Sequence, residues 1–103
     1  MKLTIAKNRL SMNPEQFLRR AGYAYILDRQ SGQGSFVRRM GRGFYPRFHV
    51  YASERGENIE FNLHLDQKQP SYAGSHAHNA EYEGEAVEGE TERLKNLLNS
   101  TGL

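Results

Sequence analysis

Apolar and polar residues alternate along two stretches in the middle of the chain, 45–53 and 58–66. A period of two is the spacing of one face of a β-strand. If Glu54 opposes Glu57, the two strands form a hairpin that keeps every apolar residue on one face. Those residues are Phe48, Val50 and Ala52 in the first strand and Ile59, Phe61, Leu63 and Leu65 in the second.

The same register predicts a polar, ionisable face on the side of the hairpin that points away from the core. Residues directly opposite each other on paired strands have neighbouring side chains. The predicted pairs on this face are Arg47 with His64, His49 with Asn62, and Tyr51 with Glu60.

A short helix is predicted within Ser11–Gly22, because both of its ends are marked. Asn13 is a good N-cap, Pro14 suits the first helical position, and Gln16 stands at the capping-box position. Gly22 can take the left-handed conformation that ends a helix. The residues predicted to face the core are Phe17, Leu18 and Ala21.

The remaining elements complete an order of β-α-β-β-β-β-α. They are a short strand around Leu3 and Ile5, a hairpin of Tyr23–Asp28 and Ser35–Met40, and a last helix from about Val87 or Glu90 to Asn99. This order predicts one α+β domain over residues 1–103. Its antiparallel sheet has four to five strands, with one or two helices packed on one face.

Composition narrows the class of protein. The chain of 103 residues has no cysteine, which excludes disulfides and thiolate metal sites. No apolar run reaches the roughly 20 residues that a membrane span needs, so a cytoplasmic protein without a membrane partner is expected. The polar, aperiodic stretch Gln67–Ala80 predicts a long and mobile loop.

Charge is sorted between the two halves of the chain. Residues 1–50 hold ten Lys and Arg against two acids, and residues 51–103 hold ten acids against four bases. Arginines interleaved with aromatic residues suit a nucleic acid, because cations bind phosphates and flat rings stack on unpaired bases. RNA or single-stranded nucleic acid is therefore the favoured partner, with no cofactor. The predicted contacts are Arg38, Arg39, Arg42 and Arg47 to phosphate, with Tyr45, His49 and Tyr51 stacking.

The same residues also fit a structural role. The arginines can pair with glutamates of the acidic half, leaving a protein-interaction module or a homodimer without catalysis. The residues assigned to the core under this interpretation are Phe36, Val37, Phe44, Phe48 and Val50.

A second candidate site is a cluster of histidines and acids. Residues two apart in an extended chain point the same way, and imidazole with carboxylate suits a divalent ion such as Zn²⁺, Mn²⁺ or Ni²⁺. The chain is then a metal-binding protein, and a hydrolase or nuclease is one form of it. The predicted ligands are His64, Asp66, His76, His78 and Glu81.

Acid–base chemistry without a metal is a further alternative. His49 and His64, near Tyr51 and Glu60, are then the candidate catalytic residues. An RNA cleaved through its own 2′-hydroxyl needs such a pair and an arginine for the phosphate.

Two stretches, Phe17–Tyr25 and Gly34–Val37, resemble the HicA-type toxins, which share a fold with double-stranded-RNA-binding domains. Those toxins place a histidine after Gly-Ser, where this chain has Phe36, so the resemblance implies the architecture and not the activity. Further stretches look like short bacterial proteins of unassigned function, a likeness that carries no chemistry. They are Tyr45–His49, Leu63–Lys68 and Pro70–Gly74.

Overall fold

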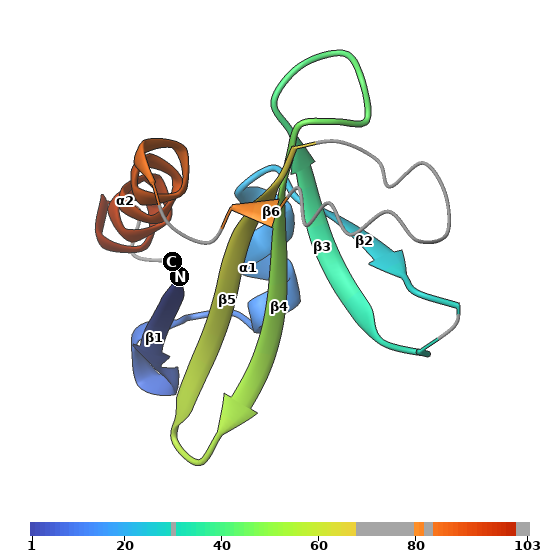
Figure 1. Ribbon diagram of the computed structural model, residues 1–103. Coiled ribbons are helices and arrows are strands. Elements are labelled where there is room, and N and C mark those ends of the chain that lie inside the picture. The colour runs from blue at the N-terminus through green and yellow to red at the C-terminus, as the bar shows by residue number, and fades with distance from the viewer. Residues whose placement is uncertain (30, 68–79, 82–83, 101–103) are drawn as a thin grey trace.

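The computed structural model describes residues 1–29, 31–67, 80–81 and 84–100. Within this part of the chain, five antiparallel strands lie in the order β1-β5-β4-β3-β2, and a short strand β6 pairs with β5 (Figure 1). The predicted α+β class and element order are confirmed, with β6 as an addition. The strands are β1 Lys2–Ala6, β2 Ala24–Leu27, β3 Gly34–Arg39, β4 Arg47–Arg55, β5 Asn58–Asp66 and β6 Ala80–Glu81.

Helix α1, Pro14–Arg20, has the predicted N-terminal cap. The Gln16 backbone N–H donates to Asn13 Oδ1 at 2.8 Å, and the Asn13 N–H donates back to Gln16 Oε1 at 3.2 Å. Phe17 and Leu18 are fully buried, as their position on the apolar face predicts. A 3-10 turn, Lys7–Arg9, joins β1 to this region.

Helix α2, Glu85–Ser100, begins earlier than predicted. The helix runs through Gly89, and Val87 is buried in the core one turn before Thr91. Packing of an apolar face outweighs the roughly 1 kcal/mol that a helical glycine costs. Neither described helix has the length and apolar character of a membrane span.

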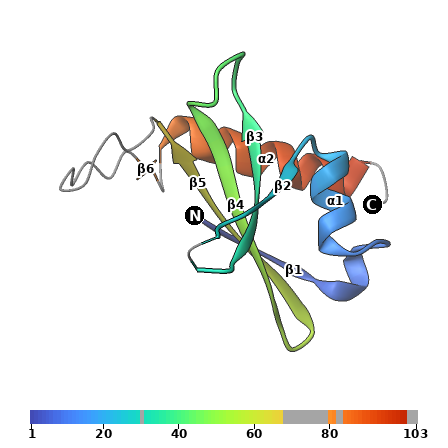
Figure 2. The same ribbon diagram turned by 90° about the vertical axis from the view of Figure 1, so that its right-hand side faces the viewer.

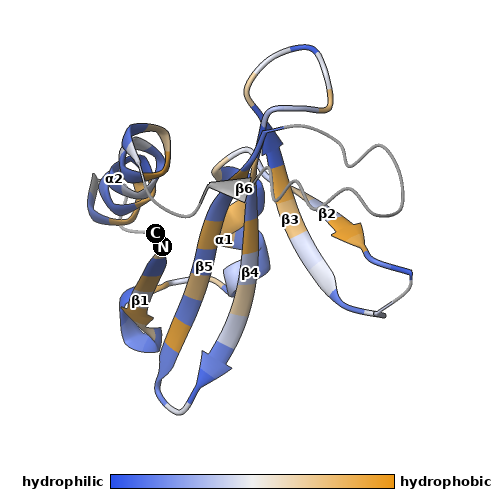
Figure 3. Cartoon of the chain, in the orientation of Figure 1, coloured by the Kyte–Doolittle hydropathy of each residue, from blue (hydrophilic) through white to orange (hydrophobic). Residues whose placement is uncertain are grey.

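The core lies between the apolar face of the sheet and the two helices. Figures 1 and 2 show α1 against one face of the sheet, while α2 lies beside the sheet and packs against β5. The Phe17 ring of α1 stacks on Phe61 of β5 with a centroid distance of 6.0 Å. The alternation of apolar and polar positions along β4 and β5 is visible in Figure 3, so the predicted faces are correct.

The predicted register of the central hairpin is wrong by two residues. Val50 pairs with Leu63 and not with Phe61, because only Gly56 and Glu57 form the loop. Gly56 has φ +59°, and a positive φ at the first position alone is the pattern of a type II′ loop. The predicted register placed Arg55 and Gly56 in the loop, whereas the observed register moves Gly56 to the first loop position, where a type II′ loop needs glycine.

This register decides which polar side chains meet. His49 lies opposite His64, and Arg47 lies opposite Asp66. A shift of two residues keeps every side chain on its face but changes its neighbour. The histidines that the sequence placed on one face therefore become direct partners.

Candidate functional site

His49 and His64 form the centre of a polar cluster on the sheet face opposite the core. Their ring centroids lie 4.8 Å apart, and only 8% and 7% of the two residues is exposed. Asp66, two residues beyond His64 on β5, reaches both rings. Its Oδ2 lies 3.1 Å from His49 Nδ1, and its Oδ1 lies 2.9 Å from His64 Nε2.

Two residues from neighbouring positions complete the cluster. The Ser35 hydroxyl, on β3, lies 2.6 Å from His49 Nε2. The Arg47 Nε–H points at Asp66 Oδ2 over 3.4 Å, a long and therefore weak hydrogen bond. Among the described residues, Asp66 thus has three partners, two imidazoles and one guanidinium.

The Asp66 carboxyl is ionised. Burial raises its pKa, but the hydrogen bonds from His49 and His64 and the charges of these rings lower it by more, so the pKa lies well below the usual range. A carboxylate only accepts hydrogen bonds. Each imidazole therefore turns an N–H toward Asp66, and the other nitrogen of His49, Nε2, lies within hydrogen-bond distance of the Ser35 hydroxyl.

The imidazole nitrogens and carboxylate oxygens of this cluster can also bind a metal ion. The ion then replaces the two N–H protons that lie between the rings and Asp66. Ligand atoms of His49, His64 and Asp66 all lie within 4.8 Å of one another. Two ligands on one tetrahedral ion at about 2.1 Å lie roughly 3.4 Å apart, so the most distant pair of ligand atoms needs to close by up to roughly 1.4 Å. Because a hydroxyl both donates and accepts, Ser35 can then accept from His49 Nε2–H and hold the ring in place.

Ser35, His49 and Asp66 also have the bond order of a Ser-His-Asp catalytic triad. A nucleophilic serine must reach its substrate, and Ser35 is only 3% exposed in the middle of the sheet. The serine is therefore assigned to positioning His49.

The predicted acid–base set comes together only in part. Tyr51 joins the histidines, with its ring centroid 4.7 Å from that of His49. Glu60 lies four residues along β5 from His64, about 13 Å away. Glu60 instead faces Lys2 at 3.9 Å and Arg55 at 3.8 Å.

The predicted metal ligands divide into two groups. His64 and Asp66 are in the cluster. His76 and His78 lie outside the described residues. Glu81 is placed by its backbone, since it pairs with Leu65 on β5. His49, which the sequence assigned to stacking or acid–base work, takes the third position in the described part of the chain.

The four arginines that were predicted to contact phosphate differ in whether an acidic side chain already pairs with them. Arg38 pairs with the buried Glu90 at 3.5 Å, and Arg47 pairs with Asp66. Arg39 stacks over the ring of Phe44 at 4.2 Å. Arg42 is exposed on the loop between β3 and β4.

The aromatic residues are placed differently from the sequence expectation. Phe44, assigned to the core, is 63% exposed on the loop between β3 and β4. Tyr45 is half-buried beneath Arg47, whose Cζ lies 4.6 Å from the ring centroid. Phe36, which stands where the toxins carry a histidine, is buried against the ring of Tyr25.

Sequence reasoning missed several polar residues that the fold buries, among them Ser35 and Glu90. Ser35 carries no motif and reaches His49 only through the register of β3 on β4. Glu90 is enclosed by Tyr23, Arg38 and Arg93, yet in the sequence it is one glutamate in an acidic run. Only the apolar period of the last helix hinted that this position is partly inward.

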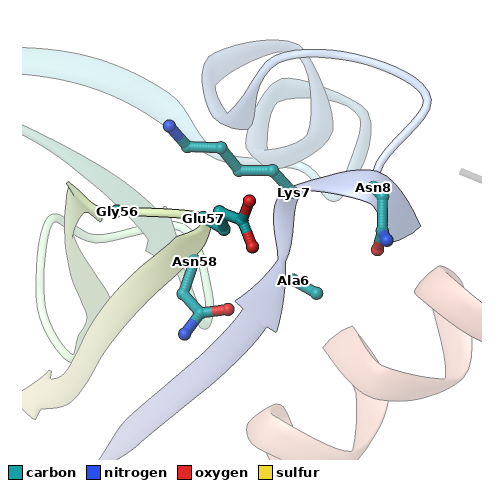
Figure 4. A pocket seen from close by; sticks show the side chains of 6 residues that line it. All are labelled: Ala6, Lys7, Asn8, Gly56, Glu57 and Asn58. Carbon is teal, nitrogen blue, oxygen red and sulfur yellow. The ribbon is translucent and has the colours of Figure 1, made fainter.

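A separate cavity of 320 Å³ lies between the end of β1 and the turn of the β4–β5 hairpin. Figure 4 shows the side chains of Lys7, Glu57 and Asn58 around it, with no histidine among its lining residues. The Lys7 backbone N–H donates to the Glu57 carbonyl oxygen at 2.8 Å, which joins the two segments. We assign this cavity no chemistry.

Comparison of the chain with protein-family models, with curated proteins and with solved structures finds no match in any of the three. Function is therefore inferred from the residues of the site.

Proposed function

We propose that the protein binds one divalent transition-metal ion through His49, His64 and Asp66. The observation that supports this is the convergence of two imidazoles and an ionised carboxylate within 4.8 Å. Two histidines with one carboxylate are a common ligand set for Zn²⁺ and for non-haem Fe²⁺. Three protein ligands leave a coordination position for water or a substrate.

The surroundings of the cluster are typical of metal-binding histidines and differ from those of histidines on an open surface. The rings are buried, and Ser35 holds the far nitrogen of His49. Outer hydrogen bonds of this kind orient ligating imidazoles and commonly change metal affinity by about 10–100-fold.

A cobalt titration tests the proposal directly. Co²⁺ binding, followed by visible absorption and by metal analysis after gel filtration, is expected to saturate at one ion per chain. Asp66→Asn removes the charged ligand with little change in shape and is expected to weaken binding at least tenfold. Asp28→Asn, in the exposed turn before β3, is the matched control and is expected to bind as the wild type does.

Equal affinity in the wild type and Asp66→Asn, or no bound ion in the wild type, would overturn the proposal. The same titration on His76→Ala and His78→Ala tests whether these two predicted ligands belong to the centre. Weaker binding in either variant adds that residue to the ligand set.

Binding of RNA or another single strand is a second candidate function. It is supported by a cavity of 390 Å³ that is lined by Arg38, Arg39 and Arg47 together with Phe44. Three cations beside an exposed ring suit a phosphate and an unpaired base. A cytoplasmic location and a homodimer stay predictions.

Anisotropy of a labelled single-stranded RNA tests this second function. Binding is expected to weaken steeply between 50 and 200 mM salt, as phosphate contacts require. Arg42→Ala is expected to reduce affinity and the salt dependence, while Arg55→Ala, 72% exposed at its side chain near the far end of the hairpin, changes neither. Equal losses in both variants would contradict a localised surface.

A further inference from the structure

Arg47 belongs to two sites at once. Its Nε–H faces Asp66 in the proposed metal centre, and its side chain lines the 390 Å³ cavity. The Arg47 side chain is only 18% exposed, and its guanidinium also rests on the Tyr45 ring. No other described residue of the metal cluster lines this cavity.

We propose that the metal centre and a nucleic-acid phosphate in the arginine cavity are coupled through Arg47, so that each strengthens the binding of the other. This inference rests on the proposed metal function and names the ligand class and the regulation of that site. The ligand is a single strand, with a phosphate in the cavity and an adjacent base on Phe44.

The cavity has the features that a single strand requires. Ala24, Ile26 and Val37 form an apolar floor on the sheet. Phe44, 63% exposed at the rim, offers a flat surface to a base. Arg39 lies over the ring of Phe44, which places a cation beside the position of that base.

The coupling follows from the competition for Asp66. In the metal-free protein, its carboxylate holds the Arg47 guanidinium 3.4 Å away. A dication on Asp66 neutralises that carboxylate and repels the guanidinium, which then turns its charge to the cavity. A phosphate that takes Arg47 likewise frees Asp66 for the ion. Linkage requires both effects to have the same size.

Arg38 does not share this role. Its partner, Glu90, is buried and is also held by Arg93 at 2.8 Å and by Tyr23. That carboxylate is remote from the metal cluster in the described contacts. Arg38 therefore contributes the same charge to the cavity whether or not the ion is bound.

The experiment measures the affinity of a labelled, mixed-sequence single-stranded RNA with and without saturating Co²⁺. In the wild type, Co²⁺ is expected to raise the affinity about fivefold or more, the lower end of typical coupling. Asp66→Asn releases Arg47 without an ion, so the metal-free variant is expected to bind RNA as tightly as the metal-loaded wild type. Added Co²⁺ is expected to leave the affinity of Asp66→Asn unchanged.

Glu60→Gln is the matched control, because it removes one carboxylate from the same face of β5. A gain in Glu60→Gln equal to that in Asp66→Asn would show a general charge effect and would overturn the coupling. Unchanged RNA affinity in a wild type that binds Co²⁺ would overturn it as well. Equal binding of a duplex of the same length would overturn the assignment of a single strand.

Failure of the proposed metal function gives a different result. If the wild type binds no Co²⁺, the proposed metal centre and the proposed coupling are both wrong. RNA binding to the metal-free protein still tests the assignment of the cavity. RNA binding that is lost in Arg39→Ala would support the cavity assignment, and unchanged binding in this variant would overturn it. Inorganic phosphate as a competitor separates a phosphate site, which it blocks, from stacking alone.

Discussion

Asp66 shows how one residue acquires its chemistry from three neighbours. The carboxylate is half-buried, and burial alone would raise its pKa, but the two imidazoles lower that pKa by more and keep it charged, with the Arg47 guanidinium as a third partner. An ionised acid in a poorly hydrated place is costly unless it is well paired. Here the pairs are two rings that are also good metal ligands, so stability and binding depend on the same atoms.

Replacement of Ser35 by alanine tests the second hydrogen bond on His49. The buried Nε2 loses its partner, which is expected to lower the free energy of unfolding by about 1–3 kcal/mol. Co²⁺ affinity is expected to fall about tenfold, because the ring is no longer oriented. Urea unfolding and the cobalt titration measure the two effects. Ser53→Ala, exposed on β4, is the control, and equal effects in both variants would contradict the role of Ser35.

Tyr23 carries a pH dependence of its own. Burial raises its pKa, and the hydrogen bond to Glu90 with the charge of this carboxylate raises it further, above the ordinary value of 10.0. Tyr23→Phe is expected to cost about 1.5–3 kcal/mol of unfolding free energy at pH 8, since a bond to a charged group is lost. That advantage of the wild type is fully present below pH 10.

Above about pH 10, the unfolded chain releases the Tyr23 proton while the folded chain retains it. The stability difference between the wild type and Tyr23→Phe is therefore expected to shrink as pH rises from 9 to 11. Urea unfolding across this range measures it. Tyr25→Phe, at a phenol that is 46% exposed, is the control. A difference that grows with pH would contradict the assignment.

At the scale of elements, the β4–β5 hairpin positions the site. Its two-residue loop sets the register, and the register places His49 opposite His64. Asp66 follows His64 by two residues on β5, so its side chain lies on the same face of the strand, beside both rings. A local turn at Gly56 thus controls contacts at the other end of the hairpin.

Two glycine substitutions separate backbone conformation from packing. No atom lies within 4 Å of a Cβ added at Gly56 or at Gly89, so neither alanine creates a clash. Gly56 has a positive φ, and Gly56→Ala is expected to lower the free energy of unfolding by about 1–2 kcal/mol. Gly89 is helical, and Gly89→Ala is expected to raise it by about 0.5–1 kcal/mol. Chemical denaturation checks both, and effects of the same sign would contradict this account.

At the scale of the whole molecule, the basic and acidic halves meet in the fold. Arg38 reaches Glu90, Arg47 reaches Asp66, and Lys7 lies 2.7 Å from Glu54. The segregation of charge along the chain therefore serves folding in part. Arg39 lines the cavity, and Arg42 is exposed on the loop between β3 and β4, so this end of the sheet stays basic.

Metal binding is expected to stabilise the whole domain. An ion that binds only the folded chain adds about 2.7 kcal/mol at one hundred times its Kd. For a chain of this size, that corresponds to a rise in Tm of about 10 °C or more. Thermal unfolding with and without Co²⁺ measures the shift, and Asp66→Asn is expected to show a smaller one. An equal rise in both proteins would contradict binding at Asp66.

Local patterns in the sequence are enough to predict the elements and their faces. The cap of α1 at Asn13 and the two-residue period around Phe48 and Phe61 are local properties, so they could be predicted without a partner. The polar face with His49 and His64 followed from the same period. The physical reason is that capping and side-chain alternation depend on neighbours in the chain.

Which of these side chains touch depends on the packing of segments that are distant in the sequence. A period of two is unchanged when one strand slides by two residues, so alternation could not distinguish His64 from Asn62 as the partner of His49. Ser35 and Glu90 are also polar residues without a local signal, and they become buried partners through packing between distant segments. The candidate metal centre therefore depends on strand register, which the loop at Gly56 and the packed core determine together.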